Sequence, residues 1–286
     1  MLIGAHVSNA GGLPNAVERA VERNCDAVQI FNQSPRQWKP TAYTDDDFAA
    51  FREAREASPI ASVLIHAVYL INCASEDREL VEKSRVSLVH SLRVGGAIGA
   101  DGVVLHAGSA LKGDVGAAIG RAGEVIRSAL DETDGCELHL ENTAGTGGTL
   151  GRSFGELAGL LEAAGGGKRL AVCLDSCHLL ASGYDVRSAE ALSGVLEDFD
   201  REVGLGRLHS LHVNDSQTPL GSNRDRHCML GTGEIGEVGC AAFLSDPAFD
   251  GLPAIFEGPG SSGKAVEPGD IVRMRELREA GVKARR

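Results

Sequence analysis

The chain repeats one pattern eight times: a short apolar run ends in a polar or aromatic residue, and an amphipathic segment usually follows. The runs end at His6, Phe31, His66, His106, Glu141, Asp175, His212 and Glu257. Consecutive ends are 25 to 45 residues apart, and a strand with its crossover helix needs about 30 residues or more. The intervening segments mostly carry apolar residues three and four positions apart, as amphipathic helices do, and Thr44, Ser153 and Glu267 lie near expected helix starts. Buried runs that alternate with helices predict parallel strands joined by helical crossovers.

Eight such units predict an α/β fold, a closed (β/α)8 barrel, whose typical size is about 250 residues. A doubly wound open sheet is the structural alternative. It usually has fewer strands and a glycine-rich first turn, and the first turn here, SNAGGLPNA, lacks G-x-G-x-x-G. We see no linker or low-complexity stretch, so we expect residues 1–286 to form one domain. In a barrel of this kind the carboxyl ends of all strands point to one face, which carries the active site.

Composition places few limits on this fold. Hydrophobic residues make up 43% of the chain and charged residues 24%, which is ordinary for a globular protein. No apolar run approaches the roughly 18 residues of a membrane helix, and MLIGAHVSNAGG lacks the pattern of a signal peptide, so we expect a cytoplasmic protein without a membrane partner. The seven cysteines form no C-x-x-C pair, which argues against a disulfide scaffold and against a thiolate zinc site.

The net charge of −12 bears on possible partners. Taken alone it argues against nucleic acid, because Lys and Arg drive binding to phosphates. A cluster of bound divalent metals would, however, add several positive charges at one face and reverse the local field. The acidic balance therefore makes a nucleic-acid partner less expected without excluding it.

Six of the eight strand ends carry a side chain that can bind a metal ion. They are His66, His106, Glu141, Asp175, His212 and Glu257, and His6 ends a seventh strand. One such residue at a strand end is more often structural. Six at one face are hard to explain as caps, because unpaired carboxylates repel one another and are costly to desolvate together. Bound cations would remove that cost.

Two loops add further candidate ligands. His178 follows Asp175 by three residues, and Asp225 and His227 are two apart, so an extended backbone presents them on one side. The total is five histidines and four carboxylates, a donor set that suits zinc or manganese. Nine ligands are too many for one tetrahedral ion and suit two or three ions with a bridging carboxylate. Clustered metals are the chemistry of phosphoester hydrolysis.

Eight segments of the chain resemble the motif series of endonuclease IV, the trizinc apurinic/apyrimidinic (AP) endonuclease family of the xylose isomerase-like TIM barrel superfamily. They are LIGAHVSNAGGL, SPRQW, HAVYLIN, LHAGS, LENTAG, DSCHLLASGYD, HVNDSQTPLGSNRDRH and FEGPG, in this order from residue 2 to about residue 260. The resemblance implies a TIM barrel that cuts the phosphodiester 5′ to an abasic site in duplex DNA and leaves a 3′-hydroxyl. It also implies trimming of blocked 3′ ends, and a role in base excision repair.

The resemblance further assigns the nine candidate ligands to three zinc ions. His66 and His106 would hold the first zinc, and Asp175, His212 and Glu257 the second. Glu141 would bridge these two, together with a hydroxide that acts as the nucleophile. The third zinc would be held by His178, Asp225 and His227, and manganese could replace part of the zinc. We expect cleavage to depend on Glu141 and Glu257 above all.

Three residues are expected to contact DNA. The resemblance places Arg36 in the DNA stack near the lesion and Tyr69 and Leu70 in the minor groove, where apolar wedges help to bend and unstack DNA. For Tyr69 and Leu70, packing within their own loop is an equal alternative. Trp38 is expected to pin its loop to the barrel, and Arg224 and Arg226 lie where they could meet phosphates.

The remaining histidines have smaller expected roles, and two positions depart from the family pattern. His6 is not a ligand in the family, so we expect a supporting hydrogen bond from it, and His139 is expected to be a satisfied core residue. Ala107 stands where the family commonly has Pro, and Gly258 where Thr is usual; neither replaces a ligand.

Two other functions compete with the nuclease. A sugar isomerase or epimerase on the same barrel also uses carboxylates and histidines at strand ends, but around one or two metals, and it has no need of His178, Asp225 and His227. A non-catalytic DNA- or metal-binding module would not need a complete, open, water-activating centre. We expect a monomer that needs no protein partner.

Overall fold

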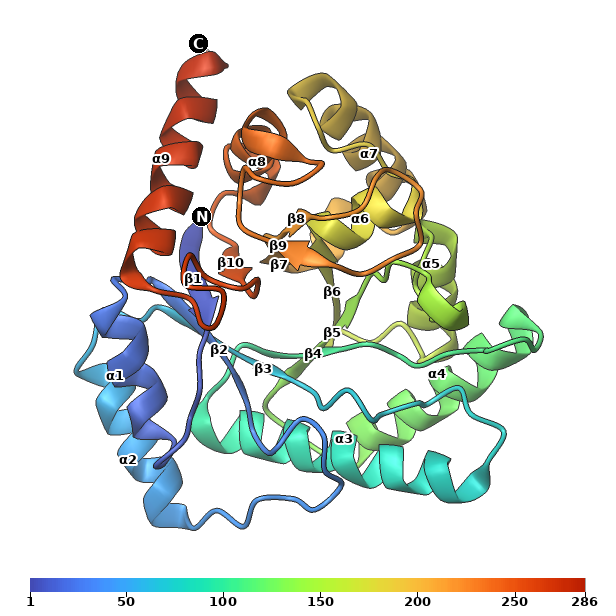
Figure 1. Cartoon of the computed structure of the whole chain (residues 1–286). Coiled ribbons are helices and arrows are strands. Elements are labelled where there is room, and N and C mark those ends of the chain that lie inside the picture. The colour runs from blue at the N-terminus through green and yellow to red at the C-terminus, as the bar shows by residue number, and fades with distance from the viewer. Residues whose placement is uncertain (286) are drawn as a thin grey trace.

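The computed structural model of the chain describes residues 1–285. Figure 1 shows the barrel strands in the middle of the molecule and most of the helices around them. The barrel strands are β1 (Leu2–His6), β2 (Ala27–Phe31), β3 (Ser62–His66), β4 (Gly102–Leu105), β5 (Glu137–Glu141), β6 (Leu170–Asp175), β7 (Leu208–His212) and β10 (Pro253–Phe256). They pair in parallel in the order β1-β10-β7-β6-β5-β4-β3-β2, and β2 pairs with β1. The sheet is therefore a closed barrel, as the eight-fold repeat predicts, and the open-sheet alternative is wrong.

Helices connect the strands and cover the outside of the barrel (Figure 1). They are α1 (Pro14–Glu22), α2 (Asp45–Glu56), α3 (Arg78–Ile98), α4 (Val115–Asp131), α5 (Phe154–Ala163), α6 (Ser176–Ser182), α7 (Ala189–Glu202), α8 (Gly236–Leu244) and α9 (Pro268–Ala284). The three expected helix starts are confirmed. Thr44 and Ser153 each cap a helix by accepting a backbone N–H, and Glu267 opens α9 with a reciprocal pair of hydrogen bonds to Asp270.

The helical pattern in the sequence does not indicate α6 and α8. The first, α6, has only seven residues, which is too short for an amphipathic period to show. The second, α8, is buried over its last six residues, so it has no polar stripe. Two short 3-10 turns, Leu205–Arg207 and Pro247–Phe249, lead into β7 and β10, and a third, Thr146–Gly148, follows β5.

A small apolar cluster fills the inside of the barrel. It consists of Ala27, Leu64, Val104, Cys173 and Ile255, from five different strands. Side chains alternate along a strand, so the residue two positions further on faces the same interior, nearer the carboxyl end. Those residues are Gln29, His66, His106, Asp175 and Glu257. Strand alternation therefore places a polar layer directly above the apolar one, at the mouth of the barrel.

A much larger hydrophobic core lies between strands and helices, and each of the helices α1 to α9 contributes buried residues to it. The seven cysteines, all within residues 1–285, are free, and six of them are buried. The expectation that they form no disulfide scaffold is confirmed. In the described part of the chain, no helix is long and apolar enough to cross a membrane.

Candidate metal centre

Four overlapping groups of ligand-type side chains lie at the carboxyl ends of the strands. Three of them, described here as clusters, together contain all nine candidate ligands, and the fourth joins Asp175 and His227 to Cys177. The first joins β3, β4 and β5. His66 Nε2 and His106 Nε2 lie 3.4 and 2.8 Å from Glu141 Oε2. His66 Nδ1 lies 2.6 Å from the carbonyl oxygen of Ala67, and a hydrogen bond to that oxygen puts the ring proton on Nδ1. Nε2 is then the free ligand atom, in the arrangement common to metal-binding histidines.

The second cluster joins Glu141, Asp175, His212 and Glu257. His212 Nδ1 lies 3.0 Å from Glu141 Oε1 and 3.1 Å from Glu257 Oε2. Its other nitrogen, Nε2, lies 2.9 Å from Gln29 Oε1. Glu141 thus turns one oxygen toward the first cluster and the other toward the second, which is the arrangement that a bridging carboxylate requires.

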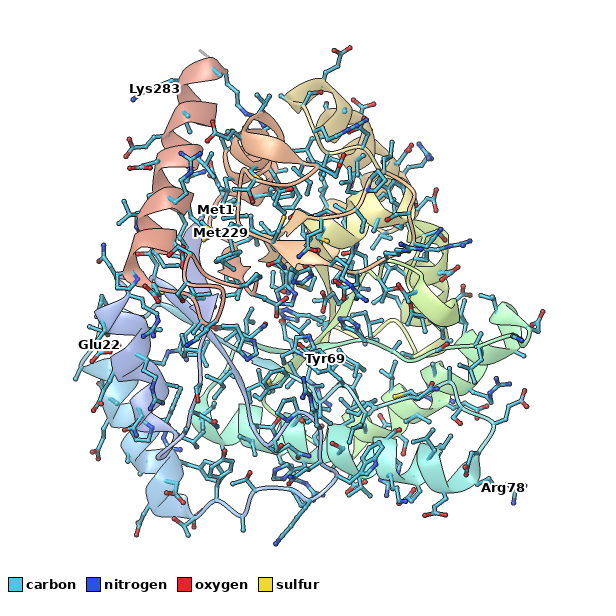
Figure 2. The ribbon with its side chains drawn as sticks, in the orientation of Figure 1. Met1, Glu22, Tyr69, Arg78, Met229 and Lys283 are labelled. Carbon is cyan, nitrogen blue, oxygen red and sulfur yellow. The ribbon has the colours of Figure 1, made fainter. Side chains whose placement is uncertain are left out.

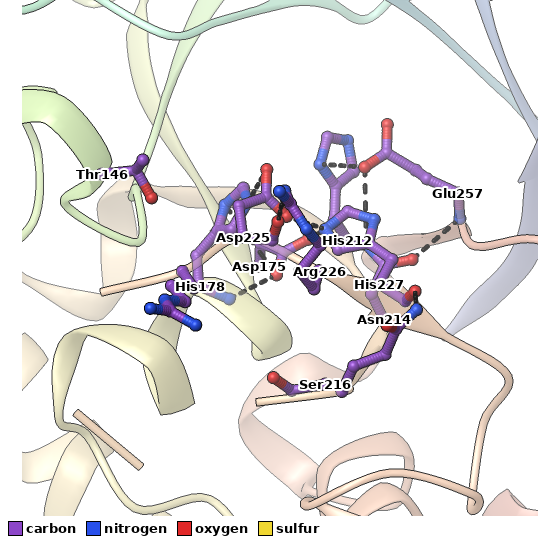
Figure 3. A network of polar contacts seen from close by, with 12 residues as sticks. Thr146, Asp175, His178, His212, Asn214, Ser216, Asp225, Arg226, His227 and Glu257 are labelled. Atoms are coloured by element: carbon purple, nitrogen blue, oxygen red, sulfur yellow. Dashed lines mark hydrogen bonds and ion pairs between the residues drawn. The ribbon is translucent and has the colours of Figure 1, made fainter. Parts of the chain in front are cut away.

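The third cluster is built from α6 and the loop after β7, as Figure 3 shows. Asp225 Oδ2 lies 3.3 Å from His178 Nε2, and Asp225 Oδ1 lies 3.1 Å from His227 Nε2. His178 Nδ1 contacts the carbonyl oxygen of Asn142 at 2.9 Å, which again leaves Nε2 for a ligand. Asp225 is the most open of the three, with a side chain 45% exposed.

A two-stranded antiparallel ribbon, β8 (Asp215–Ser216) with β9 (His227–Cys228), holds the loop of the third cluster in place. The buried carboxylate of Asp215 anchors it. This carboxylate accepts backbone N–H groups from Gly231, Gly233, Ile235 and Gly236 at 2.9 to 3.2 Å, and from Ser216 at 2.7 Å. One charged side chain thus orders the whole segment that presents His227.

The arrangement of the donor atoms suits bound cations better than it suits hydrogen bonds among the side chains. Within residues 1–285, three buried ligand atoms make no hydrogen bond: Glu141 Oε2, His178 Nε2 and His227 Nε2. Each nevertheless has an oppositely charged or polar partner within 3.4 Å. Buried polar groups are normally hydrogen-bonded. These three atoms lie close to their partners without such a bond, so each pair of atoms is directed at the space between its side chains. Cations in the first and third clusters would satisfy all three atoms.

The electrostatics of the clusters agree with this arrangement. Burial lowers the pKa of His178, but the carboxylates of Asp175, Asp225 and Glu141 outweigh burial and hold that pKa well above its usual value. Burial raises the pKa of Asp225, but the imidazoles of His178 and His227 hold it well below its usual value. Carboxylates and imidazoles here stabilise each other's charged forms, so protons occupy nitrogens that a metal would need.

Two amides and one further histidine support the clusters. Gln29 Nε2 donates to Glu257 Oε1 at 2.6 Å and lies 3.1 Å from His6 Nδ1, so His6 makes the supporting contact expected of it. Asn214 Nδ2 donates to Asp175 Oδ2 at 2.6 Å. Sequence reasoning missed Gln29 and Asn214. Gln29 could have been found from strand alternation, because it stands two residues after the interior Ala27.

The expected DNA contacts lie around this mouth but differ in exposure. Arg36 is exposed, and Tyr69 is 60% exposed although its ring packs against those of Phe31 and His66 at 5.3 Å. Figure 2 shows Tyr69 near the centre of the barrel in a view along it. Leu70 is partly buried and packs against the hydrophobic core, as Trp38 does. The core contacts of Leu70 and Trp38 hold this part of the rim in place, while most of Tyr69 faces solvent.

The two departures from the family pattern have different surroundings. Ala107 is buried. A β-carbon at Gly258 would lie 2.6 Å from Phe256 Cε2 and 3.0 Å from the carbonyl oxygen of Cys228, so this backbone leaves no room for a side chain there.

Arg224 and Arg226 are both exposed beside Asp225. His139 contacts Ser210 Oγ through Nδ1 at 2.8 Å and is buried, as expected of a core residue.

Comparison with known proteins gives consistent matches. Residues 17–279 match the family described as xylose isomerase-like TIM barrel. The probable endonuclease 4 of Halothermothrix orenii is 39% identical over 276 residues, 96% of this chain and 99% of the relative. That of Chlorobium phaeobacteroides is 40% identical over 281 residues, 97% and 98% of the two chains.

Solved structures agree. The endonuclease IV from Thermus thermophilus superposes with a TM-score of 0.84 at 39% identity, over 99% of this chain and 100% of that one. A D-tagatose 3-epimerase-like protein reaches a TM-score of 0.71 at only 19% identity, over 99% and 98% of the two chains. The second likeness shows the fold alone.

Proposed function

The chain belongs to the endonuclease IV family, and from that premise we propose that it hydrolyses the phosphodiester 5′ to an abasic site in duplex DNA and leaves a 3′-hydroxyl. Trimming of blocked 3′ ends at the same centre is part of the proposal, and both reactions serve base excision repair. The observation that carries it is the convergence of nine ligand-type side chains into three clusters at one mouth of the barrel, with Glu141 common to two of them.

We assign the clusters to three zinc ions. His66, His106 and Glu141 would hold one, Glu141 with Asp175, His212 and Glu257 a second, and His178 with Asp225 and His227 a third. When bound, such ions supply Lewis-acid chemistry: they neutralise phosphate oxygens and lower the pKa of water. Manganese suits the same imidazole and carboxylate donors and could replace part of the zinc.

The protein's own contribution is to orient these ligands and to hold the DNA. Gln29 and Asn214 keep His212, Glu257 and Asp175 in fixed orientations through hydrogen bonds of 2.6 to 2.9 Å. Such outer contacts set the tautomer and direction of a ligand. Tyr69, exposed beside the first cluster, is assigned to the minor groove together with Leu70, while Arg36 enters the DNA stack.

A cavity of about 620 Å³ opens beside the second cluster and offers room for the damaged nucleotide. His6, Phe31, Tyr69, Glu257 and Lys264 are among its lining residues. An abasic nucleotide has no base that pairs with the opposite strand, so turning it out of the duplex is inexpensive. Lys264 adds a positive charge to a chain whose net charge is −12, at a place where a phosphate would lie.

A sugar epimerase shares the barrel but not the whole constellation. One or two metals serve that chemistry, whereas the third cluster lies on the loop anchored by Asp215 and has no role in it. The epimerase likeness lies below 20% identity, against 39% for the endonuclease IV structure. The third cluster therefore favours the nuclease.

The test uses a duplex oligonucleotide with a single tetrahydrofuran abasic analogue and a denaturing gel. This analogue cannot undergo β-elimination, so only hydrolysis cuts it. We expect one cut on the 5′ side, with a 3′-hydroxyl that a polymerase extends. Glu141→Gln should bind the same duplex and lose at least about a hundredfold in rate. An undamaged duplex is the control substrate.

If protein with its full metal content leaves the analogue intact, the nuclease assignment is wrong and free sugars become the next substrates. Near wild-type cutting by Glu141→Gln would instead contradict the assignment of the bridging carboxylate, while the activity itself would stand.

A further inference from the structure

A second group of ligand-type side chains lies at the opposite end of the barrel, where the strands begin. Glu137 is the first residue of β5, and His209 is the second residue of β7. His209 Nδ1 lies 2.6 Å from Glu137 Oε2, and His139 Nε2 lies 3.3 Å from the same oxygen. Donor atoms of the three side chains are all within 4.8 Å of one another.

A β-bulge, where the pairing of β6 with β7 shifts by one residue, brings His209 into this group. Residues 137, 139 and 141 share one face of β5, so this strand serves both ends of the barrel. On β7, Ser210 faces His139 inside the barrel, and simple alternation would turn His209 away. However, Val172 pairs with Leu208 while Cys173 pairs with Ser210, so β7 has one extra residue. Such a bulge re-aims a side chain, and His209 turns toward Glu137.

The backbone also leaves room for the His139 ring. A β-carbon on Gly102 of β4 would lie 2.3 Å from His139 Nε2. Ser210 Oγ, 2.8 Å from Nδ1, fixes the ring so that Nε2 points at Glu137. In the candidate metal centre, the carbonyl oxygens of Ala67 and Asn142 orient His66 and His178 in the same way, so that Nε2 of each ring turns toward a carboxylate.

Solvent reaches the group. The side chains of Glu137 and His209 are 35% and 38% exposed, whereas that of His139 is 1% exposed. They line an open cavity of about 350 Å³, together with Ser62 and Asp101. Hydrogen bonds from His139 and His209 lower the pKa of Glu137 to about 2, so it is ionised at neutral pH. An ion could enter from solvent and keep a water molecule as a further ligand.

We propose that Glu137, His139 and His209 form a zinc site at the amino-terminal mouth of the barrel, separate from the candidate metal centre. Two imidazoles and one carboxylate, with one position open to solvent, are a donor set that zinc takes in proteins. Such an ion would tie β5 to β7 below the apolar layer, so its role is to stabilise the barrel. The site needs no assumption about what the other mouth does.

The test counts zinc. The full chain is stripped with a chelator, equilibrated by dialysis against micromolar ZnCl2, and analysed for zinc per chain. We expect His209→Asn and Glu137→Gln each to hold one zinc fewer than the wild type, to cleave abasic DNA at an unchanged rate, and to lose part of the rise in melting temperature on zinc addition. Circular dichroism checks that both variants fold.

Asp101→Asn is the matched control. It removes one negative charge from the same cavity, but its carboxylate accepts from Ser62 Oγ and the Val63 amide and is not one of the three ligands. It should hold the wild-type amount of zinc. Asp225→Asn changes the other mouth, so its zinc loss should add to that of His209→Asn in the double variant.

Equal zinc content in wild type and His209→Asn would overturn the proposal. A shared loss in His209→Asn and Asp101→Asn would also overturn it, because general electrostatic attraction would then explain the binding. Since the readout is a difference in zinc at this end, failure of abasic-site cleavage would leave the inference standing, and the reverse also holds.

Discussion

At the residue scale, the most informative side chain is one that binds no metal. Gln29 is fully buried and lies between His212 and Glu257. Its carbonyl oxygen contacts His212 Nε2, which places the ring proton on that nitrogen and leaves Nδ1 toward Glu141 and Glu257. Its amide nitrogen donates to Glu257 Oε1, and these two contacts together fix the orientation of the Gln29 side-chain amide. One neutral side chain thereby sets the state of two candidate ligands.

Gln29→Leu should therefore weaken the second cluster while keeping the volume of the side chain. Loss of such an outer contact typically costs about 10- to 100-fold in metal affinity or activity. Zinc affinity from competition with a chelator is the measurement. Gln33→Leu is the control, because this equally buried amide bonds to the backbone of Gln37 and contacts none of the clusters. Equal effects of the two changes would mean that burial, not orientation, is what matters.

At the element scale, strand alternation places ligands at the mouth formed by the carboxyl ends of the strands, and loops add the remaining ligands. Residues two positions after the apolar layer supply four ligands of the first two clusters, and the last residues of β5 and β7 supply the other two, Glu141 and His212. These clusters therefore depend on strands, which are rigid. The third cluster depends on α6 and on the loop ordered by Asp215. The precision of this cluster therefore rests on a carboxylate that is not itself a ligand.

Asp215→Asn should destabilise this loop. An amide accepts at one atom only, and its NH2 group would face backbone N–H donors. We expect a loss of about 2 kcal/mol or more in the free energy of unfolding and the selective loss of the metal held by His178, Asp225 and His227. Chemical denaturation and zinc analysis measure the two effects. Asp114→Asn, which alters a cap that accepts one backbone N–H at the start of α4, should cost about 1 kcal/mol or less and no zinc.

The loop after β3 carries the second prediction at this scale. Tyr69 is 60% exposed, and its ring rests on Phe31 and His66, so Tyr69→Ala removes a protruding aromatic without opening the core. We expect weaker binding of abasic duplex, with metal content and melting temperature unchanged. Tyr69→Phe should restore binding if stacking carries the contact. A Tyr69→Ala variant with wild-type affinity, measured by fluorescence anisotropy, would assign this loop to packing alone.

At the scale of the whole molecule, charge and metal content are linked. The chain has a net charge of −12, yet the proposed substrate is a polyanion. Burial lowers the pKa of His178, His212 and His227, but their acidic neighbours outweigh it and raise all three above the usual value of 6.5. For His212 these neighbours are Cys173 first and then Glu257 and Glu141, and for the other two rings they are carboxylates. Without metal these rings therefore favour the protonated form more strongly than a free imidazole does. Divalent ions bring more positive charge to the same mouth than these protons do.

Zinc binding at pH 7 should therefore release protons. A raised pKa means that more of the metal-free imidazole is protonated there, whereas a ligand must be neutral. We expect at least about one proton per chain, and less release as the pH rises past these pKa values. Calorimetric titration of chelator-treated protein in buffers with different ionisation enthalpies measures it. Heats that do not depend on the buffer would show that the three rings are already neutral at pH 7.

The sequence by itself determines the barrel and the nine candidate ligands. Both depend on local rules: side chains alternate in direction along short strands, helices repeat at three and four residues, and every strand of a parallel barrel ends at the same face. His66 or Glu257 can therefore be placed from its position in a run. The cap residues Thr44 and Ser153 follow from equally local chemistry.

Only the tertiary structure decides what lies between the runs. Gln29 meets His212 across 183 positions, and Asp215 meets the amides of a loop 16 to 21 residues further on. The amphipathic pattern cannot indicate α8, because burial of its last six residues removes the polar stripe. The bulge that turns His209 inward comes from the fit of β7 against β6, and no local preference for strand or turn encodes a shift of register between two strands.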